Sequence, residues 1–283
     1  MLLGLVISLS LLAAVLLCAG TGAFDTLSFL WLLPVGLVGS FLLLVALGFG
    51  IFLLICKCID PDKPREKDSP WFRWLVLEII DLLFKVLPIR LRTRGFENAP
   101  KDGRFLLVCN HLDNIDPTFL LHCLRQHPMA FVAKQESKHM FLVNKVMPML
   151  LCPYINREND REALKTILRC ISLLKNDTVS VAIFPEGRIN QYRKLAHFRP
   201  GVFKIAQKAQ VPIVVCTLQG SNQALKRVLK LRSAPVEVHL LEVIPPEAIA
   251  DKTTVEVAEY VYDLMAKDLG PENVLTPEEE ENA

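Results

Sequence analysis

The chain begins with two long apolar stretches that carry almost no charge. Residues 2–19 are uncharged and consist mostly of Leu, Val, Ile and Ala, and a second uncharged stretch extends from Leu27 to Cys56. A helix needs about 20 apolar residues to cross the hydrocarbon core of a bilayer, so each stretch is long enough to span it. The short segment from Gly20 to Thr26 between them predicts a helical hairpin. Pro34, Gly36 and Gly39 are positions where the second helix would kink or where its first part would end.

The charges that follow the hairpin predict its orientation. Lys57, Lys63, Arg65 and Lys67 come directly after the second stretch, and the positive-inside rule places this end in the cytoplasm. The pattern therefore predicts an integral protein of the cell membrane whose polar domain faces the cytoplasm. Two alternatives remain open at this point. The first stretch could be a cleaved signal peptide, although it lacks a positively charged start, and the hairpin could dip into one leaflet instead of crossing.

Residues 59–88 predict a linker followed by an amphipathic helix. Ser69 and Pro70 are typical of the cap and the first position of a helix. Trp71 and Trp74 favour a membrane interface, which would make this an interfacial helix. A core helix of the following domain needs the same apolar content, so the pattern leaves both interpretations open.

From Ile89 onward, short apolar runs alternate with amphipathic segments. Residues 89–94 alternate apolar and basic positions, as in a half-buried strand with a basic outer face. Further strands are expected at 105–109, 129–133, 179–184, 211–217 and 236–243, and helices at 117–126, 160–175, 202–209, 224–228 and 254–269. This alternation predicts an α/β fold with a mostly parallel, buried central sheet flanked by helices. The apolar face of the helix at 160–175 is expected to comprise Ala163, Leu164, Ile167, Leu168, Ile171 and Leu174.

Composition and charge agree with this division of the chain. We expect membrane helices at 1–58, the linker and amphipathic helix at 59–88, the α/β domain at 89–269 and an acidic tail at 270–283, disordered around residues 278–281. The hydrophobic content of 52% is high and is concentrated at the start, which excludes a wholly soluble, disordered or collagenous protein. Residues 57–269 hold 32 basic and 24 acidic side chains, so this part carries a net charge of +8.

This positive charge narrows the classes of partner. Beside membrane helices it favours anionic lipid headgroups or anionic substrates over nucleic acid, with an ordinary solvated surface as the alternative. The eight cysteines contain no closely spaced pair of the kind that binds zinc, and most lie inside apolar runs. They are typical of buried thiols in a reducing compartment, so neither a disulfide framework nor a metal site is expected.

The first segment with chemical potential is Asn110-His111-Leu112-Asp113-Asn114-Ile115-Asp116, directly after an expected strand. An imidazole at the end of a strand is well placed as a general base, because its usual pKa lies near working pH. A carboxylate can bond its other ring nitrogen and orient it, as in a catalytic triad. The alternative for Asp116 is purely structural, since Asp before Pro at a helix start is a good helix cap.

The second segment is Phe184-Pro185-Glu186-Gly187-Arg188, again at the end of an apolar strand. Gly187 lets the backbone turn tightly and approach a ligand, and Arg188 offers a planar fork for phosphate or carboxylate. Glu186 could hold that arginine or a substrate hydroxyl. A Pro-Glu-Gly turn alone is commonplace. Two such segments at the strand ends of one α/β sheet favour an active site, because ligands collect at that edge.

Together these segments resemble the PlsC-like 1-acyl-glycerol-3-phosphate acyltransferases, whose signatures are His-x4-Asp and Phe-Pro-Glu-Gly-Thr-Arg. Weaker blocks follow in the family's order: Pro153-Tyr154-Ile155-Asn156-Arg157, Phe198-Arg199-Pro200-Gly201 and Val211-Pro212-Ile213-Val214. The similar region covers about residues 89–246. One departure is clear, because the family's Thr between Gly187 and Arg188 is missing and Ile189 replaces the usual following Ser.

The resemblance implies a glycerolipid acyltransferase-like fold and a role for each matching residue. His111 would be the general base and Asp116 its partner, while Asn110, Arg157, Glu186, Gly187 and Arg188 would bind the glycerol phosphate acceptor. The implied reaction moves a fatty acyl group from acyl-CoA or acyl-carrier protein to the sn-2 hydroxyl of lysophosphatidate and gives phosphatidate, without a further cofactor. Other basic residues flank the motifs and could contact phosphate, the donor or anionic lipid: Lys134, Lys138, Lys145, Arg193, Lys194, Arg199 and Lys204.

Two other functions remain open at this point. The missing Thr is compatible with a different acceptor, such as another lysophospholipid or glycerol phosphate. A catalytically silent lipid-binding protein could keep the fold, although it would have no chemical need for His111 and Asp116 together. These patterns do not determine the acyl-chain length, the choice between the two donors or the oligomeric state.

Overall fold

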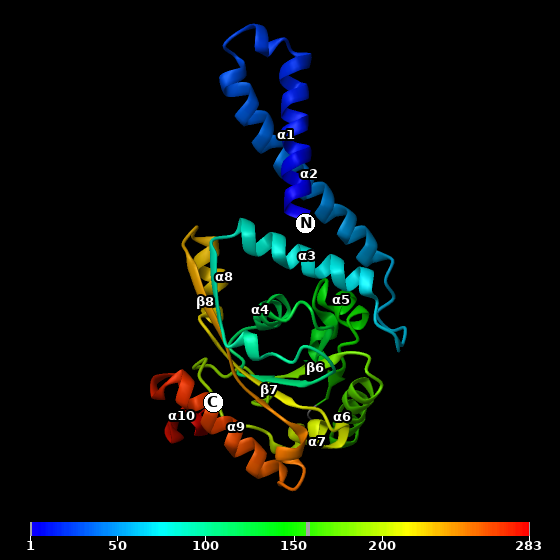
Figure 1. Ribbon diagram of the computed structural model, residues 1–283, viewed down its shortest axis with the longest axis vertical. Helices are drawn as coiled ribbons and strands as arrows, with labels where there is room; N and C mark the ends of the chain where they lie inside the picture. The colour runs from blue at the N-terminus through cyan, green and yellow to red at the C-terminus, as the bar shows by residue number, and fades with distance from the viewer. Residues whose placement is uncertain (1, 157–158, 283) are drawn as a thin grey trace. The chain divides into compact units, whose positions relative to one another are not determined.

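The computed structural model describes residues 2–156 and 159–282, which divide into two compact units between Lys63 and Pro64 (Figure 1). The first unit is a hairpin of α1 (Leu2–Gly20) and α2 (Phe29–Lys57), joined by a short turn. Both helices are long and apolar enough to cross a membrane, which is consistent with the predicted hairpin. The finer division of the chain stays a prediction.

Small residues line the contact between α1 and α2. A side chain at Gly36 would come within 3.4 Å of the Ala14 backbone, so the two helices approach closely at this point. The Ser40 hydroxyl donates a hydrogen bond of 3.0 Å to the Ser10 carbonyl across the same contact. Close approach at small residues and an interhelical hydrogen bond are typical of helices that pair in lipid. Pro34 lies inside α2, which continues as one helix to Lys57.

The second unit begins with α3 (Pro70–Val86), the expected amphipathic helix. Ser69 is the residue before the helix, but its side chain makes no capping hydrogen bond. Phe72 and Arg73 are buried, and Arg73 donates a hydrogen bond of 2.7 Å to the Met129 carbonyl. The core-helix interpretation is therefore correct for this face of α3. The two tryptophans of α3 are exposed, and the membrane-interface interpretation stays a prediction for them.

A six-stranded sheet forms the centre of the second unit, in the order β1-β8-β7-β2-β6-β3. Neighbouring strands are parallel except for β7 and β8, so the predicted mostly parallel sheet is confirmed. All residues of β2, β3 and β6 are buried, as in a sheet that is covered on both faces. The strands are β1 (Ile89–Arg94), β2 (Leu106–Cys109), β3 (Met129–Phe131), β6 (Ser180–Ile183), β7 (Ile213–Gln219) and β8 (Ala234–Ile244), and a separate small sheet pairs β4 (Ala133–Lys134) with β5 (Tyr154–Ile155).

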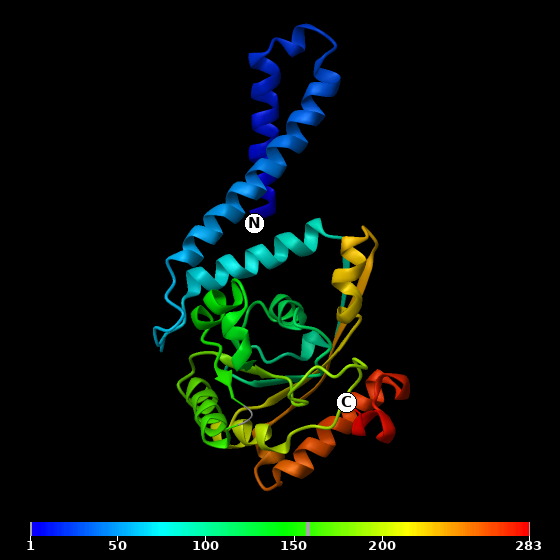
Figure 2. The ribbon, with the colours of Figure 1, turned by 180° about the vertical axis from the view of Figure 1, so that it is seen from behind.

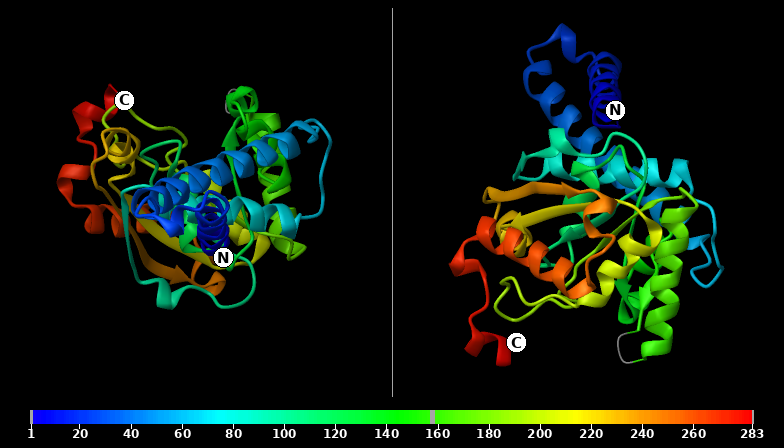
Figure 3. Two further views of the ribbon diagram at one scale, coloured as in Figure 1. Left: turned by 90° about the horizontal axis from the view of Figure 1, so that it is seen from above. Right: turned by 60° about the horizontal axis from the view of Figure 1, so that its bottom comes forward.

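Helices cover both faces of this sheet. Figures 1 and 2 show α3 and α4 on one face and α6, α7 and α9 on the other, and Figure 3 shows the same layers from two further directions. The helices are α4 (Asp116–Cys123), α5 (Val143–Met149), α6 (Asp160–Lys175), α7 (Lys204–Ala209), α8 (Ser221–Leu229), α9 (Thr254–Leu269) and α10 (Pro277–Glu281). The carboxyl ends of the parallel strands β2 and β6 meet at one edge of the sheet, where both expected site segments begin.

Helix α6 has the predicted bounds but buries a partly different face. Leu164 and Leu168, which were expected inside, are more than half exposed. The buried side chains include Thr166 and Cys170 instead, because the Thr166 hydroxyl donates a hydrogen bond of 2.7 Å to the carbonyl of Tyr154 in β5. The predicted apolar face is therefore wrong for Leu164 and Leu168, whereas Leu174 is buried as expected and the other predicted positions are half-buried.

The predicted disorder of the acidic tail around residues 278–281 is also wrong. The segment before α10 pairs with the loop that follows the second site segment: Leu195 donates to the Asn273 carbonyl at 2.8 Å and accepts from the Leu275 N–H at 3.0 Å. The Lys194 ammonium lies 2.7 Å from a Glu279 carboxylate oxygen. The ion pair with a basic side chain and the burial of Leu275 offset the loss of conformational entropy when the tail becomes ordered. Composition alone does not reveal these contacts.

Candidate active site

His111 and Asp116 form a hydrogen-bonded pair in the loop between β2 and α4. The His111 Nδ1 atom lies 2.8 Å from Asp116 Oδ2. The same oxygen accepts hydrogen bonds from the backbone N–H groups of Leu112, at 2.7 Å, and Asp113, at 2.8 Å. Asp116 is fully buried, whereas the His111 side chain is partly exposed. One carboxylate oxygen therefore orients the imidazole and also holds the turn that carries it.

The structure argues against helix capping as the role of Asp116. Asp116 is the first residue of α4, and its side chain bonds N–H groups that precede the helix, at Leu112 and Asp113, instead of those inside it. The residue before the helix is Ile115, whose side chain offers no capping oxygen. The position of the Asp116 carboxylate is thus determined by the His111 loop and not by the end of the helix.

Phe184 supplies the surface on which the imidazole lies. The rings of His111 and Phe184 are stacked, with centroids 3.9 Å apart and planes 10° apart. Phe184 directly follows β6, and the register of β2 with β6 brings this strand end beside the His111 loop. An aromatic face on one side and the Asp116 carboxylate at Nδ1 leave the Nε2 atom as the ring nitrogen available to a substrate. Sequence reasoning placed Phe184 in the motif but did not predict this contact.

Glu186 is buried and bonded to backbone. Its Oε1 atom accepts a hydrogen bond of 2.8 Å from the His111 N–H, and Oε2 accepts one of 3.3 Å from the Ala196 N–H. Burial raises the pKa of the Glu186 carboxyl to about 8, although both N–H bonds act in the opposite direction. The side chain does not line the cavity described below. In place of the expected contact with Arg188 or a substrate hydroxyl, Glu186 joins the two site loops.

Asn110 is likewise a link inside the protein. Its side-chain amide donates a hydrogen bond of 2.9 Å to the Leu218 carbonyl and accepts one of 2.7 Å from the Leu218 N–H. This two-point contact joins the end of β2 to β7, and the side chain is buried. The expectation that Asn110 contacts substrate is therefore not supported by the geometry, and its observed role is to position the residue before His111.

Gly187 and Arg188 lie at the cationic end of the site. Gly187 has a φ of +81°, and a Cβ atom there would come within 2.9 Å of the Arg199 Nε atom. A side chain at this position would therefore be strained by the backbone and would displace Arg199. Arg188 is exposed and has no ion-pair partner among residues 2–156 and 159–282. Arg157, the remaining predicted contact, lies outside the described residues.

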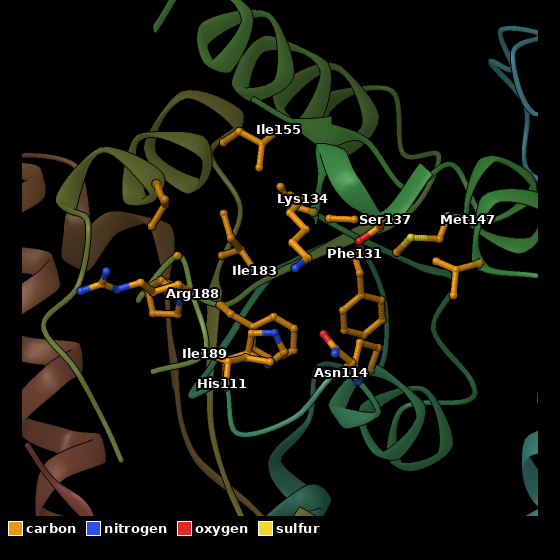
Figure 4. Close-up of a pocket in the computed structure, with 18 of the residues that line it drawn as sticks. His111, Asn114, Phe131, Lys134, Ser137, Met147, Ile155, Ile183, Arg188 and Ile189 are labelled. Carbon is orange, nitrogen blue, oxygen red and sulfur yellow. The ribbon is translucent and has the colours of Figure 1, made fainter. Parts of the chain in front are cut away.

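A cavity of about 480 Å³ lies beside His111, and Phe184, Gly187 and Arg188 also line it (Figure 4). His111, Arg188, Arg193 and Arg199 line one part of it, and Lys134 and Ser137 project from β4 and the segment after it. No carboxylate contributes to the lining that the structure describes. The remainder is mainly apolar, with side chains from β3, β6, α5 and their neighbours: Phe131, Val132, Met140, Val143, Met147, Ile155 and Ile183.

The apolar part of this lining was not predicted from the sequence. Helix α5 was not among the expected elements, although Val143 and Met147 have the four-residue spacing of one helix face. Among the flanking basic residues, Lys134, Arg193 and Arg199 line the cavity, while Lys194 is paired with Glu279. A cationic end, a histidine and a long apolar wall are suited to an anionic amphiphile whose reacting group lies between its two ends.

Comparisons with known proteins agree with this arrangement. A family model described as Acyltransferase matches residues 90–219, which include both site segments. A probable 1-acyl-sn-glycerol-3-phosphate acyltransferase of Mycoplasma pneumoniae is 29% identical over 203 residues, covering 69% of this chain and 75% of the relative. A 1-acyl-sn-glycerol-3-phosphate acyltransferase of Chlamydomonas reinhardtii is 31% identical over 190 residues, covering 64% of this chain and 53% of the relative.

The fold has a solved counterpart. The crystal structure of the 1-acyl-sn-glycerophosphate acyltransferase PlsC from Thermotoga maritima superposes with a TM-score of 0.58, at 24% sequence identity, over 78% of this chain and 86% of the other. This likeness confirms the predicted fold class. The matching family model and the relatives in sequence, together with this fold, support a PlsC-like acyltransferase family for the chain.

Proposed function

We propose that the protein transfers a fatty acyl group from a thioester donor, acyl-CoA or acyl-carrier protein, to the sn-2 hydroxyl of 1-acyl-glycerol-3-phosphate, which gives phosphatidate. The observation that carries this proposal is the His111–Asp116 pair at the wall of a cavity with one cationic and one apolar part. The proposed acceptor is the one in the names of the relatives from Mycoplasma pneumoniae and Chlamydomonas reinhardtii, a probable and a named 1-acyl-sn-glycerol-3-phosphate acyltransferase.

His111 acts as general base in the proposed step. The Asp116 carboxylate accepts a hydrogen bond from the Nδ1–H group of His111, so the Nε2 atom carries the free lone pair. This lone pair takes the proton from the acceptor hydroxyl as the hydroxyl oxygen attacks the thioester carbonyl carbon. The tetrahedral intermediate then collapses with cleavage of the C–S bond, and the thiolate recovers the proton from the imidazolium. Donor, acceptor and His111 account for every atom, so no covalent enzyme intermediate or further cofactor is invoked.

The lining and the charge of the cavity are suited to a substrate that has a phosphate group and an acyl chain. Arg188 and Arg199 offer planar forks for the acceptor phosphate, and they lie on the same lining as His111. The Met140, Val143 and Met147 side chains provide an apolar surface for an acyl chain. The acceptor has a long chain itself, so a membrane-anchored enzyme would take it from the bilayer. We infer that α1 and α2 anchor the protein in the cell membrane with the second unit in the cytoplasm.

The test is acyl transfer by the detergent-purified protein, with lysophosphatidate and a panel of acyl-CoA and acyl-carrier-protein donors. We expect phosphatidate from the unaltered protein and a fall of about 10²–10⁴-fold in kcat/KM for His111→Ala. His139→Ala is the matched control, because His139 is exposed and does not line the cavity. Full activity of His111→Ala would exclude the proposed base, and acylation of a different lysolipid only would exclude the proposed acceptor while leaving the reaction class intact.

A further inference from the structure

The end of α8 and the turn after it form an exposed surface of leucines and basic residues. The surface comprises residues 225–232, with the sequence Leu-Lys-Arg-Val-Leu-Lys-Leu-Arg, and we call it the α8 corner. Seven of its eight side chains are exposed, Val228 being half-buried. Leu229 is 76% exposed and Leu231 is 89% exposed, the latter being the most exposed of the large hydrophobic side chains described in the structure.

Local backbone geometry holds Leu231 in this exposed position. Its φ of +52° lies in the left-handed region, which glycine, asparagine and aspartate adopt readily but which is unfavourable for leucine. The turn is closed by hydrogen bonds from the Leu231 N–H to the Val228 carbonyl and from the Arg232 N–H to the Arg227 carbonyl, both 2.9 Å long. The Arg227 Nε atom also donates to the Ser233 carbonyl at 2.7 Å. The corner is therefore an ordered turn. It exposes the Leu231 side chain to water, which is unfavourable for an apolar side chain.

The charge of the corner is of one sign. Lys226, Arg227, Lys230 and Arg232 are exposed, and no acidic residue occurs between Gly220 and Val236. Leucines interleaved with cations at a tip are unlike the core of a protein interface, from which lysine is depleted. They match a bilayer that carries anionic lipids, since the leucines can enter the acyl boundary while the cations remain among the headgroups.

The corner adjoins a second exposed apolar region of the same unit. The Ala234 N–H at the start of β8 donates a hydrogen bond of 2.8 Å to the Pro88 carbonyl after α3, and Figures 1 and 2 show α8 beside this end of α3. Leu83 and Val86, in the last turn of α3, are exposed. Exposed apolar side chains therefore occur on two elements that are far apart in the sequence and whose ends lie near each other in the second unit.

From this surface we infer that the α8 corner is a membrane-contact site, which docks the catalytic unit on a bilayer containing anionic lipids. Covalent attachment favours such docking. Only 12 residues lie between the end of α2 at Lys57 and the start of α3 at Pro70, a reach of at most about 45 Å when extended. A bilayer that holds the hairpin is therefore always within reach of the second unit, at a high effective concentration. Docking by two points would limit the orientations in which the cavity meets the membrane.

The inference rests on the proposed membrane insertion of the hairpin, and the experiment tests the two separately. Full-length protein with Cys58→Ser is reconstituted into lipid nanodiscs at one copy per disc, and co-elution with the discs reports insertion. An environment-sensitive fluorophore is attached at Leu229→Cys, which leaves Leu231 in place. The matched control carries the label at Glu259→Cys, an exposed position on α9. Spin-labelled lipids report contact of each fluorophore with the bilayer, and acyl transfer by the same discs reports function.

We expect the label at position 229, but not that at 259, to emit from an apolar environment and to be quenched by lipid in discs containing phosphatidylglycerol. Each basic residue near an anionic surface raises affinity about fivefold, so Lys226→Gln with Lys230→Gln should lower the ratio of docked to undocked label about 25-fold. Discs of phosphatidylcholine alone should show a larger loss, because they remove the attraction for all four cations of the corner.

Three results would overturn the inference. The label at 229 could be as exposed to water as the label at 259, although the protein co-elutes with the discs. Its protection could be independent of both lipid charge and the two lysines. Protection could also be absent at one copy per disc and appear only when the protein is reconstituted at two copies per disc, which would identify a second copy of this chain as the partner of the corner.

Discussion

Replacement of Glu186 by glutamine is expected to change the way in which the stability of the catalytic unit depends on pH. The Glu186 carboxyl is buried, and its pKa is raised from an ordinary value of 4.5 to about 8. Below pH 4.5 the carboxyl is protonated in both the folded and the unfolded chain, so it has no effect on pH dependence. As the pH rises from 4.5 to 8, only the unfolded chain loses the proton, and the folded state is progressively destabilised.

The size of this effect follows from the raised pKa. Between pH 5.5 and pH 8.5 the unfavourable contribution of Glu186 grows by about 3 kcal/mol, at 1.36 kcal/mol for each pKa unit. Glutamine does not titrate, so the variant lacks this contribution. It keeps an oxygen for the His111 N–H but loses the longer bond from the Ala196 N–H, which costs about 1 kcal/mol at every pH. This constant cost shifts the stability of the variant equally at every pH, so only the change of the difference with pH tests the raised pKa of Glu186.

Thermal unfolding in detergent at pH 5.5, 7 and 8.5 measures the difference. The melting temperature of the unaltered protein relative to Glu186→Gln should fall by about 6–12 °C from pH 5.5 to pH 8.5, at 2–4 °C for each kcal/mol in a unit of this size. Glu259→Gln, on the exposed side of α9, should follow the unaltered protein throughout. Parallel pH profiles for Glu186→Gln and the unaltered protein would refute the reasoning, because they would mean that Glu186 ionises equally well in the folded and unfolded chain.

Three further substitutions address the base and the cationic end of the cavity. Asp116→Asn removes the charge opposite the imidazolium and puts an amide N–H₂ where Oδ1 is buried without a partner; steady-state kinetics should show kcat about 10³-fold lower, and unchanged kcat would exclude this role. Gly187→Ala should raise KM for the acceptor about 10-fold through displacement of Arg199, with KM for the donor unchanged; equal changes in both would contradict this. Phe184→Leu removes the ring under His111 and should lower kcat about 3–10-fold, with Phe184→Tyr restoring it; a failure of tyrosine to restore kcat would argue against stacking.

Much of the catalytic unit could be predicted because its patterns are local. The alternation at 89–94, the apolar runs that became β2 and β6, and the helix at 254–269 each follow from the spacing of apolar residues. The meeting of the two site segments at one edge of the sheet needed only the rule that parallel strand ends share that edge, whereas the stacking of His111 on Phe184 was not predicted. In these cases the information lies within a few residues of the element concerned.

Features that depend on a partner distant in sequence could not be predicted from local patterns. Asn110 and Glu186 have the side chains of ligand-binding residues, but their partners are backbone groups at Leu218, His111 and Ala196, which no local pattern reveals. The buried face of α6 depends on a hydrogen bond to β5, and the order of the acidic tail depends on a basic loop about 80 residues earlier. Local propensity is overridden in each case by a tertiary contact.

The pairing of β1 with β8 has a consequence for synthesis of the chain. Ile89 is opposite Ala234, so 145 residues separate the first strand of the sheet from its neighbour. At about 5–20 residues per second, β1 emerges from the ribosome roughly 7–30 s before β8 and has no sheet partner during that time. The arginines at positions 90, 92 and 94 then protect an unpaired strand edge from association with other chains. The apolar hairpin of α1 and α2 is synthesised even earlier, so the second unit completes its sheet only after the hairpin has left the ribosome.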